Sequence, residues 1–207
     1  LRLWVASEDY RNDVAYSRGI LDQLGESYRK VRNTVRFALG NLYDFDPGTD
    51  EVAAAALLPL DRCFLDKLGR LAARLRQAYE DYEFHLVFRS LTNFCAVDLS
   101  SYYFDILKDR LYCEAPRSPA RRSAQTVLYH TARTLASLMA PIFVFTADDV
   151  WRSLPRRAGD PGSVHLARFA APPAADAAAR AAEIEVLESL RARVQKALEE
   201  FRAQKNK

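Results

Sequence analysis

The 207-residue sequence has little of what marks a membrane protein, a disulfide scaffold or a sheet protein. It contains no apolar run long enough for a membrane span and no signal-peptide pattern at its start. Its three cysteines, Cys63, Cys95 and Cys113, lie far apart and match no zinc or redox spacing, so we expect buried, reduced thiols in a cytoplasmic protein. Only seven glycines occur, while alanine, leucine, arginine and glutamate are abundant, which favours helices.

Catalytic motifs are also missing from the sequence. It has no glycine-rich phosphate loop, no Gly-x-Ser-x-Gly elbow and no two histidines at a helical metal spacing. His85, His130 and His165 are isolated, and we expect structural roles for them. We therefore predict no catalytic residue and no metal ligand. The net charge of +3 is only mildly basic, so any attraction for nucleic acid must be local.

The strongest binding signal lies in residues 28–37, Tyr-Arg-Lys-Val-Arg-Asn-Thr-Val-Arg-Phe. At about 100° per residue, the helix containing this run has two faces. The apolar face carries Ile20, Leu24, Tyr28, Val31, Val35, Ala38 and Leu42. The opposite face, here called the arginine stripe, carries Arg18, Asp22, Gly25, Arg29, Arg32, Asn33 and Arg36.

Phe37 belongs to neither face, because it lies about 90° around the helix from the arginine stripe. We expect its ring to face solvent beside the arginines. Positive charge for phosphates next to an aromatic ring for an unstacked base is typical of proteins that bind single-stranded RNA loops. The alternative is an ordinary solvated face and a phenylalanine that packs on a neighbouring helix.

The remaining patterns predict an all-α bundle of about five helices with a short strand-containing extension and a C-terminal helical arm. Ser17 is the expected N-cap of a helix to about Leu42, and a capping box at Thr146–Asp149 is expected to open a short helix. The other expected elements are helices 61–82, 84–96, 98–113 and 118–139, a strand at 163–169, an Ala/Pro linker at 170–175 and a helix from Asp176. The expected divisions are a connection (1–16), the bundle (17–155), the extension and linker (156–175) and the arm (176–207).

The two ends of the sequence suggest a piece of a longer polypeptide. Leu1 lies within an apolar run and is not an initiator methionine, and the last residues stop within a charged helical pattern. The arm carries an apolar seam without an evident partner, so we expect it to be mobile or to pack on a second copy.

Six segments together resemble the anticodon-binding region of bacterial isoleucyl-tRNA synthetases, which are class I aminoacyl-tRNA ligases. They are residues 1–7, 28–37, Phe94-Cys95, Ile106-Leu-Lys-Asp-Arg-Leu-Tyr112, Ala120-Arg-Arg-Ser-Ala-Gln-Thr-Val-Leu-Tyr-His130 and Ala140-Pro-Ile-Phe-Val-Phe-Thr-Ala-Asp-Asp-Val-Trp151. The enzymes for valine, leucine and methionine share the bundle and the closing Arg-Phe of the second segment. The Arg-Asn-Thr and Ile-Leu-Lys-Asp-Arg sequences resemble the isoleucine enzyme more closely.

This resemblance implies a non-catalytic role in protein synthesis. The chain would hold the anticodon stem-loop of tRNA(Ile), while the catalytic domain of the same polypeptide uses ATP and Mg to attach isoleucine. The resemblance further implies a cytoplasmic monomer with no cofactor, synthetase activity or editing activity in these residues. The competing interpretations are a helical protein-interaction module and the anticodon-binding domain of a sister synthetase.

The RNA-binding interpretation assigns roles to individual residues. Arg18, Arg29, Arg32 and Arg36 would contact phosphates or bases, Asn33 would read a base edge and Phe37 would stack on a base. Arg121, Arg122 and Gln125 form a second polar patch that either binds tRNA or is merely solvated. Gly25 would allow close backbone approach or is simply a tolerated surface glycine.

Three departures from the family pattern limit how many of the family's properties can be assigned to this sequence. Ala15 stands where many relatives have an arginine, which removes one expected tRNA contact, and Cys63 stands where relatives commonly have tryptophan. The C-terminal zinc-binding segment of many relatives is absent from this sequence.

Overall fold

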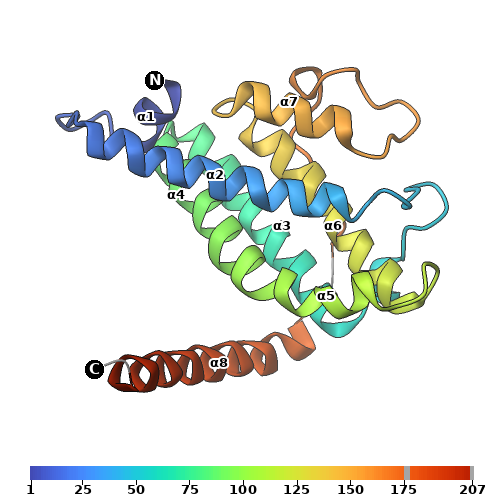
Figure 1. Ribbon diagram of the computed structural model, residues 1–207. Helices are drawn as coiled ribbons and strands as arrows, with labels where there is room; N and C mark the ends of the chain where they lie inside the picture. Colours follow the sequence, from blue (N-terminus) through green and yellow to red (C-terminus); the bar gives the residue numbers. More distant parts are fainter. Residues whose placement is uncertain (175–177, 206–207) are drawn as a thin grey trace.

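The computed structural model describes residues 1–174 and 178–205, and this part of the chain contains helices and no β-strand (Figure 1). The α-helices are α1 (Arg2–Ser7), α2 (Arg18–Gly40), α3 (Pro59–Glu80), α4 (Phe84–Asn93), α5 (Phe104–Tyr112), α6 (Pro119–Met139), α7 (Val144–Ser153) and α8 (Ala178–Lys205). A π-helical segment, η2 (Phe94–Tyr103), joins α4 to α5, and two short 3-10 turns are η1 (Ala54–Ala56) and η3 (Val164–Leu166). The all-α prediction is confirmed. None of the described helices has the length and apolar content needed to cross a membrane.

Helix α6 forms the centre of the bundle. Buried residues lie on both its apolar and its polar side, among them Leu128, Leu135, Thr126 and Ser137, each at most 3% exposed. A helix whose polar side is buried as well as its apolar side must be enclosed by other elements, and α2, α3, α5 and α7 all pack against α6. The expected start of this helix is confirmed, because the Ser118 side chain accepts the backbone N–H of Arg121 at 3.1 Å.

Residues 84–112 form one continuous helical path rather than the two separate helices we expected. Within η2 the turns widen, so that the N–H of Phe104 donates to the carbonyl of Leu99, five residues back. The Thr34 hydroxyl of α2 lies 3.2 Å from the Cys95 carbonyl oxygen and 2.9 Å from Ser100 Oγ. This polar contact fixes α2 against the widened turns.

The expected capping box before α7 is wrong. The helix begins at Val144, and Phe143 occupies the N-cap position without a side-chain hydrogen bond to the helix. Thr146 instead lies inside the helix with its hydroxyl 3.0 Å from Tyr28 Oη of α2. The Thr146 side chain, which the local sequence pattern assigned to a helix cap, therefore forms a tertiary contact with Tyr28 instead.

The expected strand at residues 163–169 is also wrong, because this segment contains the 3-10 turn η3. Asp148 Oδ1 of α7 accepts the Ser163 hydroxyl at 2.6 Å and the Val164 N–H at 3.1 Å. These bonds hold the segment against α7, and no other strand lies among the described residues to pair with it.

The described part of α8 lies along the outside of the bundle (Figure 1). Arg191 connects it to η2, donating to the Ser101 carbonyl at 2.9 Å and lying 4.7 Å from the centre of the Tyr102 ring. Its apolar seam remains on the surface: Leu187, Leu190, Val194, Leu198 and Phe201 are 48–61% exposed. The ends of the predicted arm, at 176–177 and 206–207, lie outside the described residues.

The three cysteines differ in their surroundings. Cys63 and Cys95 are buried, as expected, and burial raises the pKa of the Cys95 thiol to about 12. Cys113 is exposed at the end of α5, so the expectation of a buried thiol is wrong there.

Candidate nucleic-acid interface

Packing of the inner face of α2 against the core fixes the rotation of this helix, and so fixes which side chains point outward. Val31, Val35 and Ala38 are 1–2% exposed in the core, as the helical periodicity predicts. Tyr28 stacks with Phe143, with 6.2 Å between ring centres. Ser17 caps the helix by accepting the N–H of Ile20 at 3.2 Å, which confirms the predicted start. These contacts hold α2 in one rotational setting, with the arginine stripe turned outward.

The arginine stripe lies on the surface as predicted. Arg18, Arg29, Arg32, Asn33 and Arg36 are all exposed. Arg29 forms an ion pair with Glu26 one turn earlier. Within the described part of the chain, no hydrogen bond or ion pair engages the side chains of the other four. Guanidinium groups without an internal partner keep all their N–H donors for a ligand.

Gly25 leaves an open position on the arginine stripe. A Cβ atom placed on it would meet nothing within 4 Å, so no other part of the described chain approaches this glycine. The packing of the protein itself therefore does not require glycine here.

Phe37 does not project into solvent as expected. Its ring is half-buried, packs against the main core and stacks with Phe104 of α5, with 4.5 Å between ring centres. The helical angle put Phe37 on a flank of α2, about 90° from the arginine stripe, and α5 covers that flank. One face of the ring is therefore occupied within the protein.

The expected exposed patch at Arg121, Arg122 and Gln125 is wrong. Arg121 is 3% exposed, and its guanidinium donates to the Asp44 carboxylate at 2.5 and 2.9 Å. It also donates to the carbonyl oxygens of Leu111 and Pro116 at 3.2 and 3.0 Å. This arginine joins α6 to the turn after α2 and to the end of α5.

Gln125 and Arg122 belong to the same buried network. Gln125 is fully buried and donates to the Asn41 carbonyl at 2.9 Å and to Asp44 Oδ1 at 2.8 Å. Arg122 donates to the Asp44 carbonyl at 2.9 Å and to Gln125 Oε1 at 2.8 Å. The hydrogen bonds from Arg121, and then those from Gln125, lower the pKa of Asp44 below its ordinary value. The network has a structural role.

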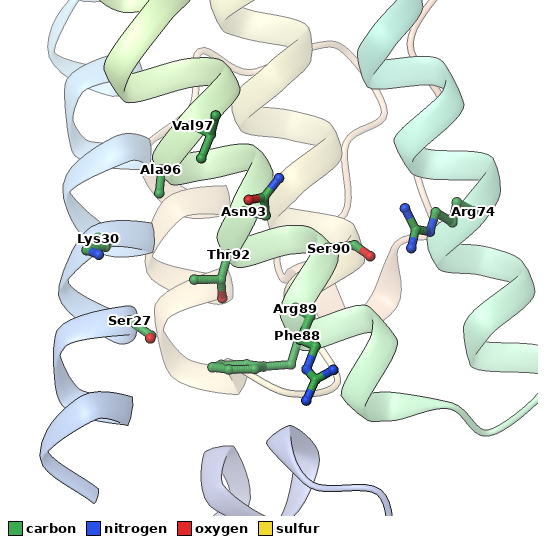
Figure 2. Close-up of a pocket in the computed structure, with 10 residues that line it drawn as sticks. All are labelled: Ser27, Lys30, Arg74, Phe88, Arg89, Ser90, Thr92, Asn93, Ala96 and Val97. Carbon is green, nitrogen blue, oxygen red and sulfur yellow. The ribbon is translucent and has the colours of Figure 1, made fainter. Parts of the chain in front are cut away.

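A cationic groove over α4 was not predicted from the sequence. It has a cavity volume of about 660 Å³. Figure 2 shows Lys30 of α2 on one side, Arg74 of α3 on the other and Arg89 of α4 between them. Three separate helices contribute these cations, so no local spacing in the sequence brings them together. The one sequence feature that could have indicated the groove is Lys30, a further cation next to the arginine stripe.

No cluster of three metal-binding side chains occurs among the described residues. His130 is 5% exposed, and its Nε2 lies 2.8 Å from Glu51 Oε1. Burial lowers the pKa of His130, against the opposing effect of Glu51. Arg157 also contacts Glu51. The group ties α6 to two loops.

Comparison with known proteins relates this architecture to a family. Residues 61–207 match the family described as "Anticodon-binding domain of tRNA ligase". The chain belongs to this family. Helix α2 precedes the matched range.

Similar curated proteins named isoleucine--tRNA ligase extend the relationship. The Moorella thermoacetica protein is 56% identical over 81% of this chain and 18% of its own length. The proteins of Symbiobacterium thermophilum and Syntrophomonas wolfei are 50% and 51% identical over 99% of this chain and 22% of their own lengths, so these alignments include α2. The resemblance to isoleucyl-tRNA synthetases is confirmed. The chain spans about a fifth of the length of these relatives.

Proposed function

We propose that the chain is the anticodon-binding part of an isoleucine--tRNA ligase, and that the arginine stripe of α2 holds the anticodon stem-loop of tRNA(Ile). The observation that carries this proposal is the row of exposed arginines, Arg18, Arg32 and Arg36, without internal partners on a rigidly held helix. The match to anticodon-binding domains supports it.

The chemistry of the arginine stripe suits an RNA loop. The planar guanidinium group binds a phosphate through two parallel hydrogen bonds, and it also stacks on an exposed base. Asn33 is exposed one turn before Arg36 on the helix surface and carries both a donor and an acceptor for a base edge. Arg29 would have to leave Glu26 to join them. Because Phe104 covers one face of Phe37, base stacking by that ring is restricted to its remaining free surface.

Catalysis in this proposal belongs to the rest of the polypeptide. Activation of isoleucine with ATP and Mg would take place in a catalytic domain attached to this chain, since the chain corresponds to about a fifth of the related ligases. The working protein would be a cytoplasmic monomer in protein synthesis.

Competition between two RNA hairpins tests this proposal. Labelled tRNA(Ile) of Symbiobacterium thermophilum would be bound to the chain and then displaced by the anticodon stem-loop or by the acceptor stem of the same tRNA. We expect the anticodon hairpin to displace the tRNA at far lower concentration. Equal displacement by both hairpins, or no binding of the tRNA, would contradict the proposal. The absence of tRNA binding would favour the protein-interaction module instead, with the exposed seam of α8 as its contact surface.

A further inference from the structure

The cationic groove over α4 begins where the arginine stripe ends. Lys30 follows Arg29 by one residue, so it lies about 100° further around α2, on the side of α4 and η2. From Lys30 the groove crosses α4 at Arg89 and reaches Arg74 of α3 (Figure 2). The stripe and the groove therefore form one positively charged path over three helices.

The lining of the groove contains cations without counter-charges. Lys30, Arg74 and Arg89 are exposed, and no carboxylate is among the lining residues. No ion pair or hydrogen bond engages these three side chains within residues 1–174 and 178–205. Like charges around one groove repel each other, and a bound anion removes that repulsion.

The inner surface of the groove offers further donors and an apolar floor. The Thr92 hydroxyl is buried and has no hydrogen-bond partner among the described residues. Ser90 is half-buried and Asn93 is exposed, and both add polar groups, while the buried Phe88 adds apolar surface to the lining. An unsatisfied buried hydroxyl costs free energy unless a ligand or water bonds to it, so this position suits an acceptor-rich ligand.

We propose that the cationic groove binds the phosphodiester backbone of an RNA strand that continues from the arginine stripe. The proposal rests on the proposed function and adds a second contact surface to it. A phosphodiester strand supplies an anion at each nucleotide, which matches cations spaced along a path better than a single small anion would. Lys30, Arg89 and Arg74 would each contact phosphate, and Thr92 would donate a hydrogen bond.

Neutralising the cations one at a time tests the groove. The affinity for tRNA(Ile) would be measured against NaCl concentration for the chain and for Lys30→Gln, Arg74→Gln and Arg89→Gln. Each substitution should weaken binding roughly 5- to 10-fold at about 0.1 M salt and reduce the slope of log K against log salt by about 0.7 to 0.9. Arg89→Lys should keep most of the affinity, since a point charge suffices for a phosphate.

Arg152→Gln provides the matched control. Arg152 is an exposed arginine on α7 that pairs with Asp148, and its side chain is 65% exposed. This variant removes the same charge away from the groove and should change affinity by less than about twofold. Unchanged thermal unfolding of all variants would show that the fold is intact.

The outcomes separate the groove from the proposed function. If the groove variants bind tRNA like Arg152→Gln while Arg32→Gln loses affinity, the groove proposal is overturned and the arginine stripe stands. If the groove variants lose affinity for poly-glutamate but keep their affinity for tRNA, the groove binds an acidic protein segment and the RNA proposal is wrong. If the parent chain does not bind tRNA, the proposed function itself fails.

Discussion

Arg36 and Phe37 are adjacent in sequence but have opposite surroundings, which gives a direct stability prediction. Phe37 packs against Phe104 and the core, whereas Arg36 is exposed without a partner in the described structure. Phe37→Ala should lower the free energy of unfolding by about 2 to 3 kcal/mol, somewhat less than for a fully buried ring. Arg36→Ala should change it by less than about 0.5 kcal/mol. Urea denaturation of both variants measures this, and equal stability would show that the ring does not contribute to the core.

Asp44 should make stability depend on pH in the acid range. Its carboxylate is bound by Arg121 and Gln125, which lower its pKa in the folded state. Its contribution to stability is therefore complete above the unfolded pKa of about 4 and is lost as pH falls through the lowered folded pKa. Asp44→Asn should cost about 1 to 3 kcal/mol at neutral pH.

The control for Asp44 is the same comparison at low pH. The stability difference between the parent and Asp44→Asn should shrink steadily as pH falls below about 4, because Asp44 in the unfolded parent then binds a proton while the folded state, with its lowered pKa, still holds the carboxylate ionised. Urea denaturation from pH 7 to pH 3 measures the difference. A constant difference over that range would mean that the charge of Asp44 does not matter.

At the scale of residues, helical periodicity predicted which side chains of a helix are buried when burial depends only on the face of that helix. Val31, Val35 and Ala38 are in the core because successive turns of α2 align them. Periodicity could not identify partners distant in sequence. Arg121 is buried because Asp44, 77 residues earlier, neutralises it, and only the folded chain brings them together. The same limit explains Phe37, whose flank is covered by Phe104.

At the scale of elements, helix starts were predictable when the capping side chain had no stronger tertiary partner. Ser17 and Ser118 bond to the first turns of α2 and α6. Thr146 bonds to Tyr28 instead, and α7 begins two residues before it. Residues 163–169 alternate like a strand, but Asp148 holds them against α7.

Helix α8 should be the least protected of the long helices. Its contact with η2 includes the hydrogen bond from Arg191 to Ser101, and its apolar seam is about half exposed. Amide hydrogen exchange over residues 186–202 should be much faster than over α6, since few buried apolar contacts oppose local opening. Arg191→Ala should speed this exchange further. Exchange in α8 as slow as in α6, in a dilute monomer, would contradict the prediction.

For the whole molecule, the proposed function predicts that the chain binds tRNA(Ile) but does not activate isoleucine. A pure preparation of the chain should show no isoleucine-dependent exchange of pyrophosphate into ATP, because the chain corresponds to about a fifth of the related ligases and the proposal places the catalytic domain in the remainder. A longer relative, such as the enzyme of Symbiobacterium thermophilum, serves as the positive control. Exchange by the chain alone would contradict the prediction.

The salt dependence of tRNA(Ile) affinity for the parent and for the double variant Arg32→Gln, Arg36→Gln tests the central claim most directly. If the arginine stripe binds the anticodon stem-loop, the variant should bind more weakly, and its slope of log K against log salt should fall by about 0.7 to 0.9 for each lost phosphate contact. Both side chains are exposed, so the fold should remain intact. The same affinity and the same slope for parent and variant would contradict the claim that α2 is the RNA-binding surface.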